Sequence, residues 1–244
     1  MMNVAVAGAT GYLGKPVVER LLLLKSNVLS LGAKPATADL LHNPNFMHHE
    51  TEISADSQIT RFFEEFTSIH GPIDGLLILT SRSARGLETD NQGDTFSKNL
   101  VLGIEPTRKL LLESRRFLNL GASVVVVSSL WARRIPEPAM YLDLGNEPAL
   151  SVPATKAAQL QLARYFAVLW AKDHIRVNLL TPGWFPRPGP VERRDYISEI
   201  TRRTPMGRIG QPTDLVEPIL FLLGKGSGFI TGQELVVDGG YSLW

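Results

Sequence analysis

Three glycines near the start of the chain have a spacing suited to binding phosphate. Gly8, Gly11 and Gly14 directly follow a short apolar run, Asn3–Ala7, and precede an amphipathic stretch. Glycines in such a turn let the backbone approach a pyrophosphate, and the N–H groups of the following helix face the phosphates. The pattern indicates a dinucleotide site, with an ordinary strand–helix turn as the alternative. Its contacting residues would be Gly8, Thr10, Gly11, Tyr12 and Leu13.

The choice between NAD and NADP is expected at the end of the second strand, about 20 residues beyond the glycines. The segment Leu29-Ser-Leu-Gly32-Ala-Lys34 contains no carboxylate that could accept a hydrogen bond from the adenosine ribose. Gly32 leaves room there, and the Lys34 ammonium could contact a 2′-phosphate. The segment therefore favours NADP(H) over NAD(H). A solvent-exposed loop lysine is the alternative.

The elements that must position these residues alternate along the chain. Near-continuous apolar runs predict buried strands, with a weaker strand at Phe46–Ile53; the others are Asn3–Ala7, Asn27–Leu31, Gly75–Thr80, Ser123–Ser128, Ile175–Leu180 and Glu234–Val237. Helices are predicted between them at about Leu13–Lys25, Ser57–Ile69, Phe96–Leu118, Pro153–Lys172 and Thr213–Leu223. This alternation predicts an α/β fold, a Rossmann-type doubly wound parallel sheet in one domain over residues 1–244.

Local sequence also predicts how one helix begins and where the loops lie. The Thr213 hydroxyl and the early Asp214 carboxylate are expected to cap the helix at Thr213–Leu223. Two segments rich in Pro and Arg, Leu130–Ser151 and Trp184–Thr204, interrupt the alternation and are predicted to be irregular. Long irregular loops in such folds usually border the active site.

Composition excludes several classes of protein. The 244 residues include 25 Lys and Arg against 24 Asp and Glu, so the chain lacks the basic excess of a nucleic-acid binder. It has no cysteine, which excludes disulfides and thiolate chemistry, and its five histidines lack metal-ligand spacing. No apolar run approaches the roughly 20 residues of a membrane span, and the start of the chain shows no charged leader. We therefore expect no metal, nucleic-acid or membrane partner and a cytoplasmic location.

The last third of the chain carries three motifs: Arg176-Val-Asn-Leu-Leu-Thr-Pro182-Gly183, Pro205-Met-Gly-Arg-Ile-Gly-Gln-Pro212, and Phe229-Ile-Thr-Gly-Gln-Glu-Leu-Val-Val-Asp238-Gly-Gly240. With the glycine loop, these motifs closely resemble the short-chain dehydrogenase/reductase family over the whole chain. The resemblance implies a sheet of about seven strands, a nicotinamide cofactor, and catalysis by an Asn–Ser–Tyr–Lys group.

The resemblance assigns roles to three of those four catalytic residues. Asn99 matches the helix asparagine that supports a proton-relay water, and Ser129 matches the serine that polarises the substrate carbonyl. Lys156 matches the lysine that binds the nicotinamide ribose and lowers the pKa of the tyrosine. Val152 stands four residues before Lys156, where the family has its tyrosine, and valine has no proton to donate.

Other cofactor contacts are also carried over from the family. Glu52 and Ile53 match residues beside the adenine, and Thr80 lies where the family has Asn-Asn-Ala-Gly. Contacts to the nicotinamide are expected from the loop after the sixth strand, at Pro182, Gly183 and Phe185. Trp184 and Phe185 could form an apolar lid over nicotinamide and substrate, with a pure packing role as the alternative. Arg187 replaces a threonine that often contacts the nicotinamide amide.

The segment before Val152 is longer than the family norm and contains Tyr141, which could supply the missing phenol or simply pack. We expect an NADP(H)-dependent oxidoreductase acting on a small carbonyl or alcohol, with Tyr141, a water on Lys156 or a substrate hydroxyl as the acid. The alternatives are non-redox chemistry in the same pocket, such as elimination, isomerisation or cyclisation, and a catalytically silent dinucleotide-binding protein.

The sequence also suggests partners. Arginines in the two irregular segments allow an anionic small-molecule substrate, although solvent-exposed loop arginines are the alternative. The family resemblance implies a homodimer or homotetramer packed through the helices at Phe96–Leu118 and Pro153–Lys172. The second of these helices is apolar around much of its circumference, at Leu160, Leu162, Phe166 and Leu169.

Overall fold

The structure is a computed structural model that describes residues 1–53, 56–80, 95–135, 150–187 and 194–244. Its seven strands form one parallel sheet in the order β3-β2-β1-β4-β5-β6-β7, so the predicted seven-stranded Rossmann sheet is confirmed. The strands are β1 (Asn3–Ala7), β2 (Asn27–Gly32), β3 (Phe46–Glu50), β4 (Ile73–Ile78), β5 (Leu118–Val127), β6 (Arg176–Pro182) and β7 (Glu234–Val237).

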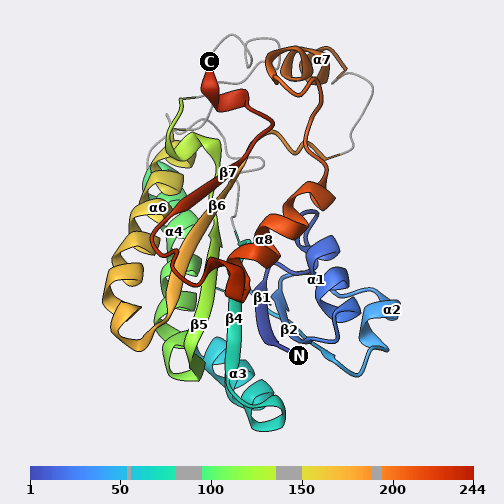
Figure 1. Cartoon of the computed structure of the whole chain (residues 1–244), viewed down its shortest axis with the longest axis vertical. Coiled ribbons are helices and arrows are strands. Elements are labelled where there is room, and N and C mark those ends of the chain that lie inside the picture. The colour runs from blue at the N-terminus through green and yellow to red at the C-terminus, as the bar shows by residue number, and fades with distance from the viewer. Residues whose placement is uncertain (54–55, 81–94, 136–149, 188–193) are drawn as a thin grey trace.

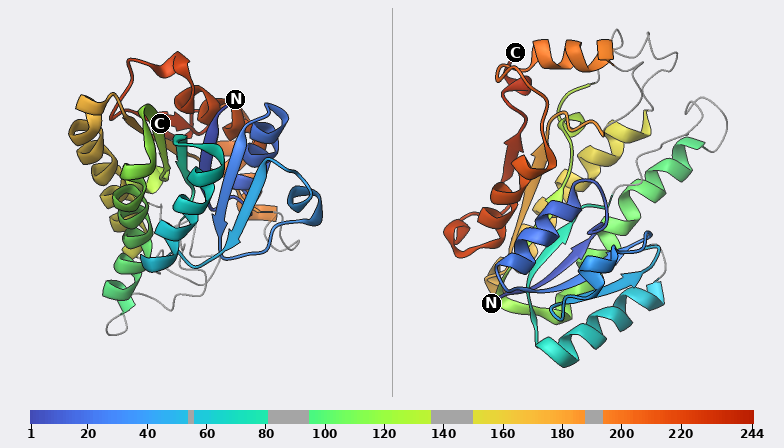
Figure 2. Two further views of the ribbon diagram at one scale, coloured as in Figure 1. Left: turned by 90° about the horizontal axis from the view of Figure 1, so that it is seen from below. Right: turned by 90° about the vertical axis from the view of Figure 1, so that its right-hand side faces the viewer.

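Helices cover both faces of this sheet (Figures 1 and 2). One face packs against α3 (Asp56–His70), α4 (Thr95–Ser114) and α6 (Ser151–Trp170), and the other against α1 (Gly14–Leu23), α2 (Ala38–Leu41) and α8 (Val216–Leu223). None of the helices in the described ranges is long and apolar enough to cross a membrane.

The near-continuous apolar strands are buried because each strand contributes to both cores. In β1, Ala5 and Ala7 pack against the α3–α4–α6 side, whereas Val4 and Val6 pack against the α1–α8 side. All four side chains are inaccessible to solvent. A strand that alternated apolar and polar residues would bury polar side chains on one of the two covered faces. A continuous apolar run therefore predicts a strand in a sheet that is covered on both faces.

Two predicted helices differ from the structure at their ends. The helix expected to reach Leu118 ends at Ser114, because Leu118 pairs with Ile73 of β4 and already belongs to β5. The helix expected from Thr213 begins as a 3-10 turn, Pro212–Leu215, which precedes α8. Its cap is Gln211 rather than the Thr213 hydroxyl, because the Asp214 carboxylate accepts a hydrogen bond from the Gln211 backbone N–H at 2.8 Å.

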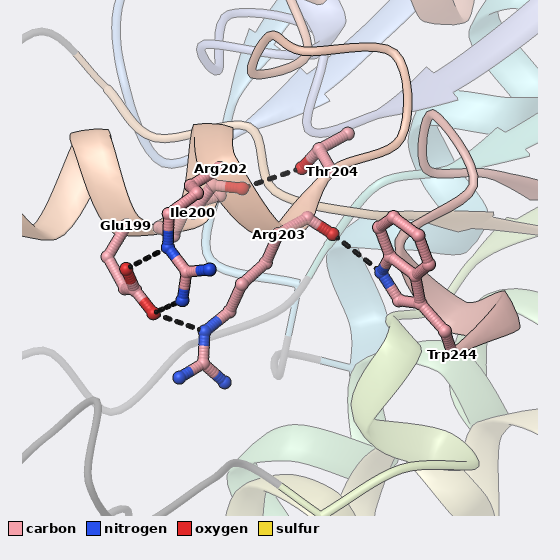
Figure 3. Close-up of polar contacts among 6 residues, drawn as sticks. All are labelled: Glu199, Ile200, Arg202, Arg203, Thr204 and Trp244. Carbon is pink, nitrogen blue, oxygen red and sulfur yellow. Dashed lines mark hydrogen bonds and ion pairs between the residues drawn. The ribbon is translucent and has the colours of Figure 1, made fainter.

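The prediction of an irregular segment at Trp184–Thr204 is wrong in its second half. Residues Arg194–Arg203 form helix α7, which lies at the same end of the molecule as the end of the chain (Figures 1 and 2). The helix was missed because its apolar face consists of only three residues, Tyr196, Ile197 and Ile200, within a segment rich in Pro and Arg. Only Ile200 of its described side chains is fully buried, and ion pairs of Glu199 with Arg202 and Arg203 support the last turns (Figure 3).

Candidate active site

The glycine loop joins β1 to α1 in a turn that only glycine permits. Gly8 has a φ of +90°, and a Cβ there would lie 3.1 Å from the Leu79 Cβ. A Cβ on Gly14, the first residue of α1, would lie 2.4 Å from the Gly8 carbonyl oxygen. The backbone of this loop is therefore packed against itself, with the N-terminus of α1 directly behind it, which is the geometry of a phosphate cradle.

The loop after β2 lies against the glycine loop. A Cβ on Gly32 would be 3.2 Å from the Thr10 Oγ1, and that hydroxyl donates to the Lys34 carbonyl oxygen at 3.3 Å. The Lys34 side chain is exposed beside them. The structure therefore brings together Thr10, Gly32 and Lys34, three of the residues predicted to hold the cofactor.

The remaining residues of the glycine loop face in two directions. The Tyr12 hydroxyl donates to the Pro186 carbonyl oxygen at 3.2 Å, so the glycine loop contacts the segment after β6. Leu13 packs against the core cluster on the α1 side of the sheet. Beyond β3, Glu52 is exposed, whereas Ile53 is 7% exposed and belongs to the core on the α3 side. The predicted adenine contact of Ile53 is thus limited to a small part of its surface.

Two serines at the end of β5 have different partners. The Ser128 hydroxyl donates to the Lys156 carbonyl oxygen at 3.2 Å and ties β5 to α6. The Ser129 Oγ accepts a hydrogen bond from the Trp131 backbone N–H at 3.3 Å, where a 3-10 turn, Leu130–Ala132, begins. Ser128 therefore holds the strand to the helix, while Ser129, the predicted catalytic serine, stands at the start of the loop.

Lys156 lies on α6, is 7% exposed, and has its Nζ 3.1 Å from the Gln159 Oε1. Burial lowers the pKa of Lys156 to about 8, because removal from water disfavours the ammonium form. In turn, the Gln159 Nε2 donates to the Gly103 carbonyl oxygen and the Thr107 Oγ1 of α4, both at 3.1 Å. Gln159 thereby connects the lysine to the neighbouring helix.

Three further positions complete this edge of the sheet. Asn99 is 6% exposed on α4. Thr80, just beyond β4, has a buried Oγ1 without a hydrogen-bond partner in the described part of the chain. Val152 is half-buried at the second position of α6, one helical turn before Lys156, so both side chains lie on the same side of the helix.

The two aromatic residues of the loop after β6, Trp184 and Phe185, pack against different neighbours. The Gly183 N–H donates to the Val237 carbonyl oxygen at 2.9 Å, which fixes the Pro182–Gly183 turn. Phe185 packs on Gly210, where a Cβ would lie 2.5 Å from the ring. Trp184 instead joins the rings of Trp131, Tyr196 and Tyr241. The two rings therefore have different packing neighbours, and both line one cavity beside Asp238.

A carboxylate that the sequence analysis did not single out connects the loops of this site. The side chain of Glu234 on β7 is 2% exposed, accepts a hydrogen bond from Thr181 Oγ1 at 2.5 Å, and pairs with Arg133. These contacts join the loop after Ser129 to the end of β6. Apart from Lys156, the partners of Gln159 and Glu234 lie 52 to 101 residues away in the chain, so the sequence gives little signal for these two residues.

Some predicted features cannot be placed in this site. Tyr141 lies outside the described residues. Within the described ranges, no group of three or more His, Asp or Glu side chains is arranged to hold a metal ion.

Comparison with known proteins places the chain among enzymes of one family. Residues 32–242 match the family model described as enoyl-(acyl carrier protein) reductase. The chain is 39% identical over 254 aligned residues to a tropinone reductase homolog, At2g29170, of Arabidopsis thaliana, which covers 99% of this chain and 90% of that protein. A second Arabidopsis tropinone reductase homolog, At2g29260, is 37% identical over 138 residues, and the match spans 38% of its length.

Solved structures share the fold. A short-chain dehydrogenase from Leptospira borgpetersenii with bound NAD+ superposes with a TM-score of 0.86 at 24% identity, over 99% of this chain and 92% of that one. A short-chain dehydrogenase family protein from Francisella tularensis gives a TM-score of 0.79 at 24% identity, with full coverage of both chains. Together with the sequence matches, these findings show that the chain belongs to the short-chain dehydrogenase/reductase family of oxidoreductases.

Proposed function

We propose that the protein is an NADP(H)-dependent oxidoreductase that interconverts a small carbonyl compound and its alcohol. The observation that carries this proposal is the buried Lys156 ammonium at the carboxyl edge of the sheet, near the end of β5 that bears Ser129. A buried ammonium is costly unless a ligand or another residue accepts hydrogen bonds from it. The reductase name of the Arabidopsis relative supports the same reaction class.

The residues present suit a dinucleotide. The close-packed Gly8–Gly14 turn exposes backbone to a pyrophosphate, and the unpartnered Thr80 hydroxyl offers a polar contact between that turn and Lys156. Lys156 would bind the nicotinamide ribose, Ser129 would orient the substrate carbonyl, and Asn99 would hold a water. The nicotinamide, when bound, would supply or accept the hydride. The side chains described here bind and orient the reactants.

Replacing Gly14 by alanine should weaken NADPH binding at least tenfold. The new Cβ would lie 2.4 Å from the Gly8 carbonyl oxygen, so the turn has to open and its N–H groups move away from the phosphates. Calorimetric titration with NADPH measures the change. Gly226→Ala is the matched control, because its Cβ would make only an ordinary 3.4 Å contact with Phe221. Equal affinities of the two variants for NADPH would show that this loop is not part of the cofactor site.

NADPH should bind several-fold more tightly than NADH. The exposed Lys34 ammonium beside Gly32 can pair with a 2′-phosphate, and one such contact contributes roughly 1 kcal/mol at an exposed site. Lys34→Ala should reduce the ratio of the two affinities toward one. Lys172→Ala, an exposed lysine beyond α6, should leave it unchanged. A wild-type preference for NADH would overturn the assignment to NADP(H).

Non-redox chemistry is the second candidate, and Val152 is the observation that favours it. A ketone reduced by hydride becomes an alkoxide, which needs a proton donor within about 2.6–3.2 Å. Valine cannot donate one turn before Lys156. Elimination, isomerisation and cyclisation can proceed without an alkoxide, and so can turnover of a substrate that carries its own acidic hydroxyl.

Assembly into a homodimer or homotetramer through α4 and α6 is also part of the proposal. Leu160 and Phe166 of α6 belong to the core of the monomer, so they do not support an interface. The exposed apolar residues of the two helices support an interface. They are 46–81% exposed: Val101, Leu112, Tyr165, Val168 and Leu169. Light scattering should give at least twice the chain mass of 26.9 kDa at micromolar concentration. A 27 kDa species would contradict the proposed assembly.

A further inference from the structure

Gln159 of α6 is a polar side chain with no exposure to solvent. Its amide oxygen accepts a hydrogen bond from the Lys156 Nζ at 3.1 Å. Its amide nitrogen donates to the Gly103 carbonyl oxygen and to the Thr107 Oγ1 of α4, both also at 3.1 Å. Burying an amide is unfavourable unless its polar atoms are paired, and both ends of this amide are paired. The side chain is therefore held in one orientation.

The partners of Gln159 determine which end of its amide faces the lysine. The Gly103 carbonyl oxygen can only accept a hydrogen bond, so the amide nitrogen must point to α4. The amide oxygen, which also can only accept, therefore points to the Lys156 Nζ. A hydrogen bond from a charged donor is stronger than one from a neutral donor. Gln159 thus stabilises the ammonium form of Lys156 over the neutral amine.

No other group in the described part of the chain stabilises this ammonium. Among the described residues, the Lys156 Nζ has no second hydrogen bond and no ion pair. Burial acts in the opposite direction, because it lowers the pKa of Lys156. An ammonium has three N–H bonds, so the two that Gln159 does not receive remain for a ligand.

The charged side chains near α6 engage other groups. They lie on α4, beside the 3-10 turn Leu130–Ala132 and on β6, and they pair with one another, bind neutral polar groups or face water: Lys98, Glu105, Arg108, Lys109, Glu113, Arg133 and Arg176. Within the described ranges, burial is the one cause of the lowered pKa of Lys156. The neutral Gln159 amide is therefore the contact that decides how well the buried charge is tolerated.

Gln159 also fixes the lysine relative to α4. The two helices touch at Gly103, where a Cβ would lie 2.4 Å from the Thr155 Cγ2. This close approach lets the Gln159 amide reach the α4 backbone. Asn99 lies one helical turn before Gly103, on the same side of α4. The position of the Lys156 Nζ is therefore tied to the side of α4 that carries Asn99.

We propose that Gln159 is a positioning residue for the reaction, which holds the Lys156 Nζ beside α4 and keeps it in its ammonium form. Because Gln159 is fully buried, it acts through Lys156 and touches neither substrate nor cofactor. The inference rests on the proposed function in one respect, namely the binding of the nicotinamide ribose by Lys156.

A pH titration of the cofactor-free protein with ¹³C-labelled lysine measures the protonation of Lys156 directly. Gln159→Met keeps the length of the side chain and removes the acceptor, so it should lower the pKa of Lys156 from about 8 to about 7. Lys156→Met assigns the signal by its loss. Gln161→Met is the matched control, because it makes the same change at an exposed position of the same helix and should leave the pKa unchanged. An unchanged pKa in Gln159→Met would overturn the inference.

Gln159→Glu tests the contact itself and does not require an apolar side chain to be accepted at this position. It retains the size of the side chain and places a carboxylate oxygen beside the Lys156 Nζ. An opposite charge at this distance should raise the pKa of Lys156 above the wild-type value. A pKa that does not rise would show that residue 159 does not contact the Nζ, and would overturn the inference.

The affinity for NADPH should follow the protonation of Lys156. At pH 8, about half of the lysine would be protonated in the wild type and about a tenth in Gln159→Met, whereas at pH 6 nearly all of it would be protonated in both. The loss of NADPH affinity caused by Gln159→Met should therefore be about fivefold greater at pH 8 than at pH 6. Calorimetric titration at the two pH values measures this difference. An equal loss at both would show that Gln159 acts only through packing, which would overturn the inference.

The two measurements separate this inference from the proposed function. A lowered pKa in Gln159→Met, together with an NADPH affinity that neither Gln159→Met nor Lys156→Met changes, would support the action of Gln159 on the lysine. In that case, the proposed binding of the ribose by Lys156 fails alone. Loss of NADPH binding in Lys156→Met with an unchanged pKa in Gln159→Met would support the cofactor site and overturn the role of Gln159.

Discussion

Lys156→Met is expected to stabilise the cofactor-free protein at pH 7 by about 1–3 kcal/mol and to lower turnover at least 100-fold. Removing the lysine deletes a buried ammonium whose pKa burial lowers from 10.5 to about 8. Such a shift means that the folded state holds the proton less well than the unfolded state does. The same substitution removes the group proposed to bind the nicotinamide ribose, so stability and activity should change in opposite directions.

The pH dependence follows from the direction of this shift. Below about pH 8 Lys156 is protonated in both states, and the folded state carries the full cost of the buried charge. Between about pH 8 and 10.5 the unfolded chain binds more protons, so the free energy of unfolding of the wild type rises with pH over this window. The stability gap between Lys156→Met and the wild type should therefore shrink as the pH approaches 10.5.

Denaturant unfolding of both proteins at pH 7 and pH 10 measures this gap. Lys172→Met is the matched control, because it removes an exposed lysine and should change neither stability nor turnover. A gap that is the same at both pH values would show that Lys156 titrates normally. A variant that is less stable than the wild type at pH 7 would show that the contact with Gln159 outweighs the cost of burying the charge.

If Tyr141 does not supply the acid, Val152→Tyr is expected to raise the rate of reduction of simple ketones about 100-fold. Val152 lies one turn before Lys156 on the same side of α6, so a tyrosine there would place its phenol near the lysine. Loss of one preorganised donor of this kind typically costs 10²–10³ in rate, and its restoration should recover a comparable factor. Val152→Phe adds the same ring without the hydroxyl and should give no increase.

Steady-state oxidation of NADPH with a panel of ketones gives the rates, and Tyr141→Phe completes the series. If Tyr141 supplies the acid, its loss should suppress turnover and Val152→Tyr should add little. If it does not, Tyr141→Phe should be neutral and Val152→Tyr should create activity. If the Tyr141→Phe variant turns over the natural substrate at the wild-type rate, this phenol has no role, and substrate-assisted or non-redox chemistry is favoured.

The strands of this protein could be predicted because their signal is local. Runs such as Val4–Ala7 and Val124–Val127 are buried on both faces, so their continuous apolar character appears directly in the sequence. Helix α7 was missed because its apolar face is small: Tyr196, Ile197 and Ile200 are its only apolar residues, they lie among charged side chains, and the segment around them is rich in Pro and Arg. The end of α4 was missed because the pairing of Leu118 with Ile73 is a tertiary contact.

Some residues of the candidate site could also be predicted from local sequence, and others could not. The glycine loop, Lys34, Ser129 and Lys156 were found because motif spacing marks them, and the structure places them along one edge of the sheet. Trp184 packs against other aromatic rings and Phe185 packs on Gly210, and both sets of contacts are tertiary. Neither residue type nor spacing contains that information. The bonds of Gln159 to α4 and of Glu234 to Thr181 and Arg133 join residues far apart in the chain, so only the folded structure reveals them.

A crystal structure of the protein with bound NADP+ tests the central claim most directly. The account predicts the pyrophosphate on the N-terminus of α1 beside Gly8 and Gly11. It also predicts the 2′-phosphate near Lys34, and a ribose hydroxyl of the nicotinamide half within about 3.2 Å of the Lys156 Nζ. A cofactor bound with its nicotinamide ribose away from Lys156, or crystals that take up no NADP+ at millimolar concentration, would contradict it.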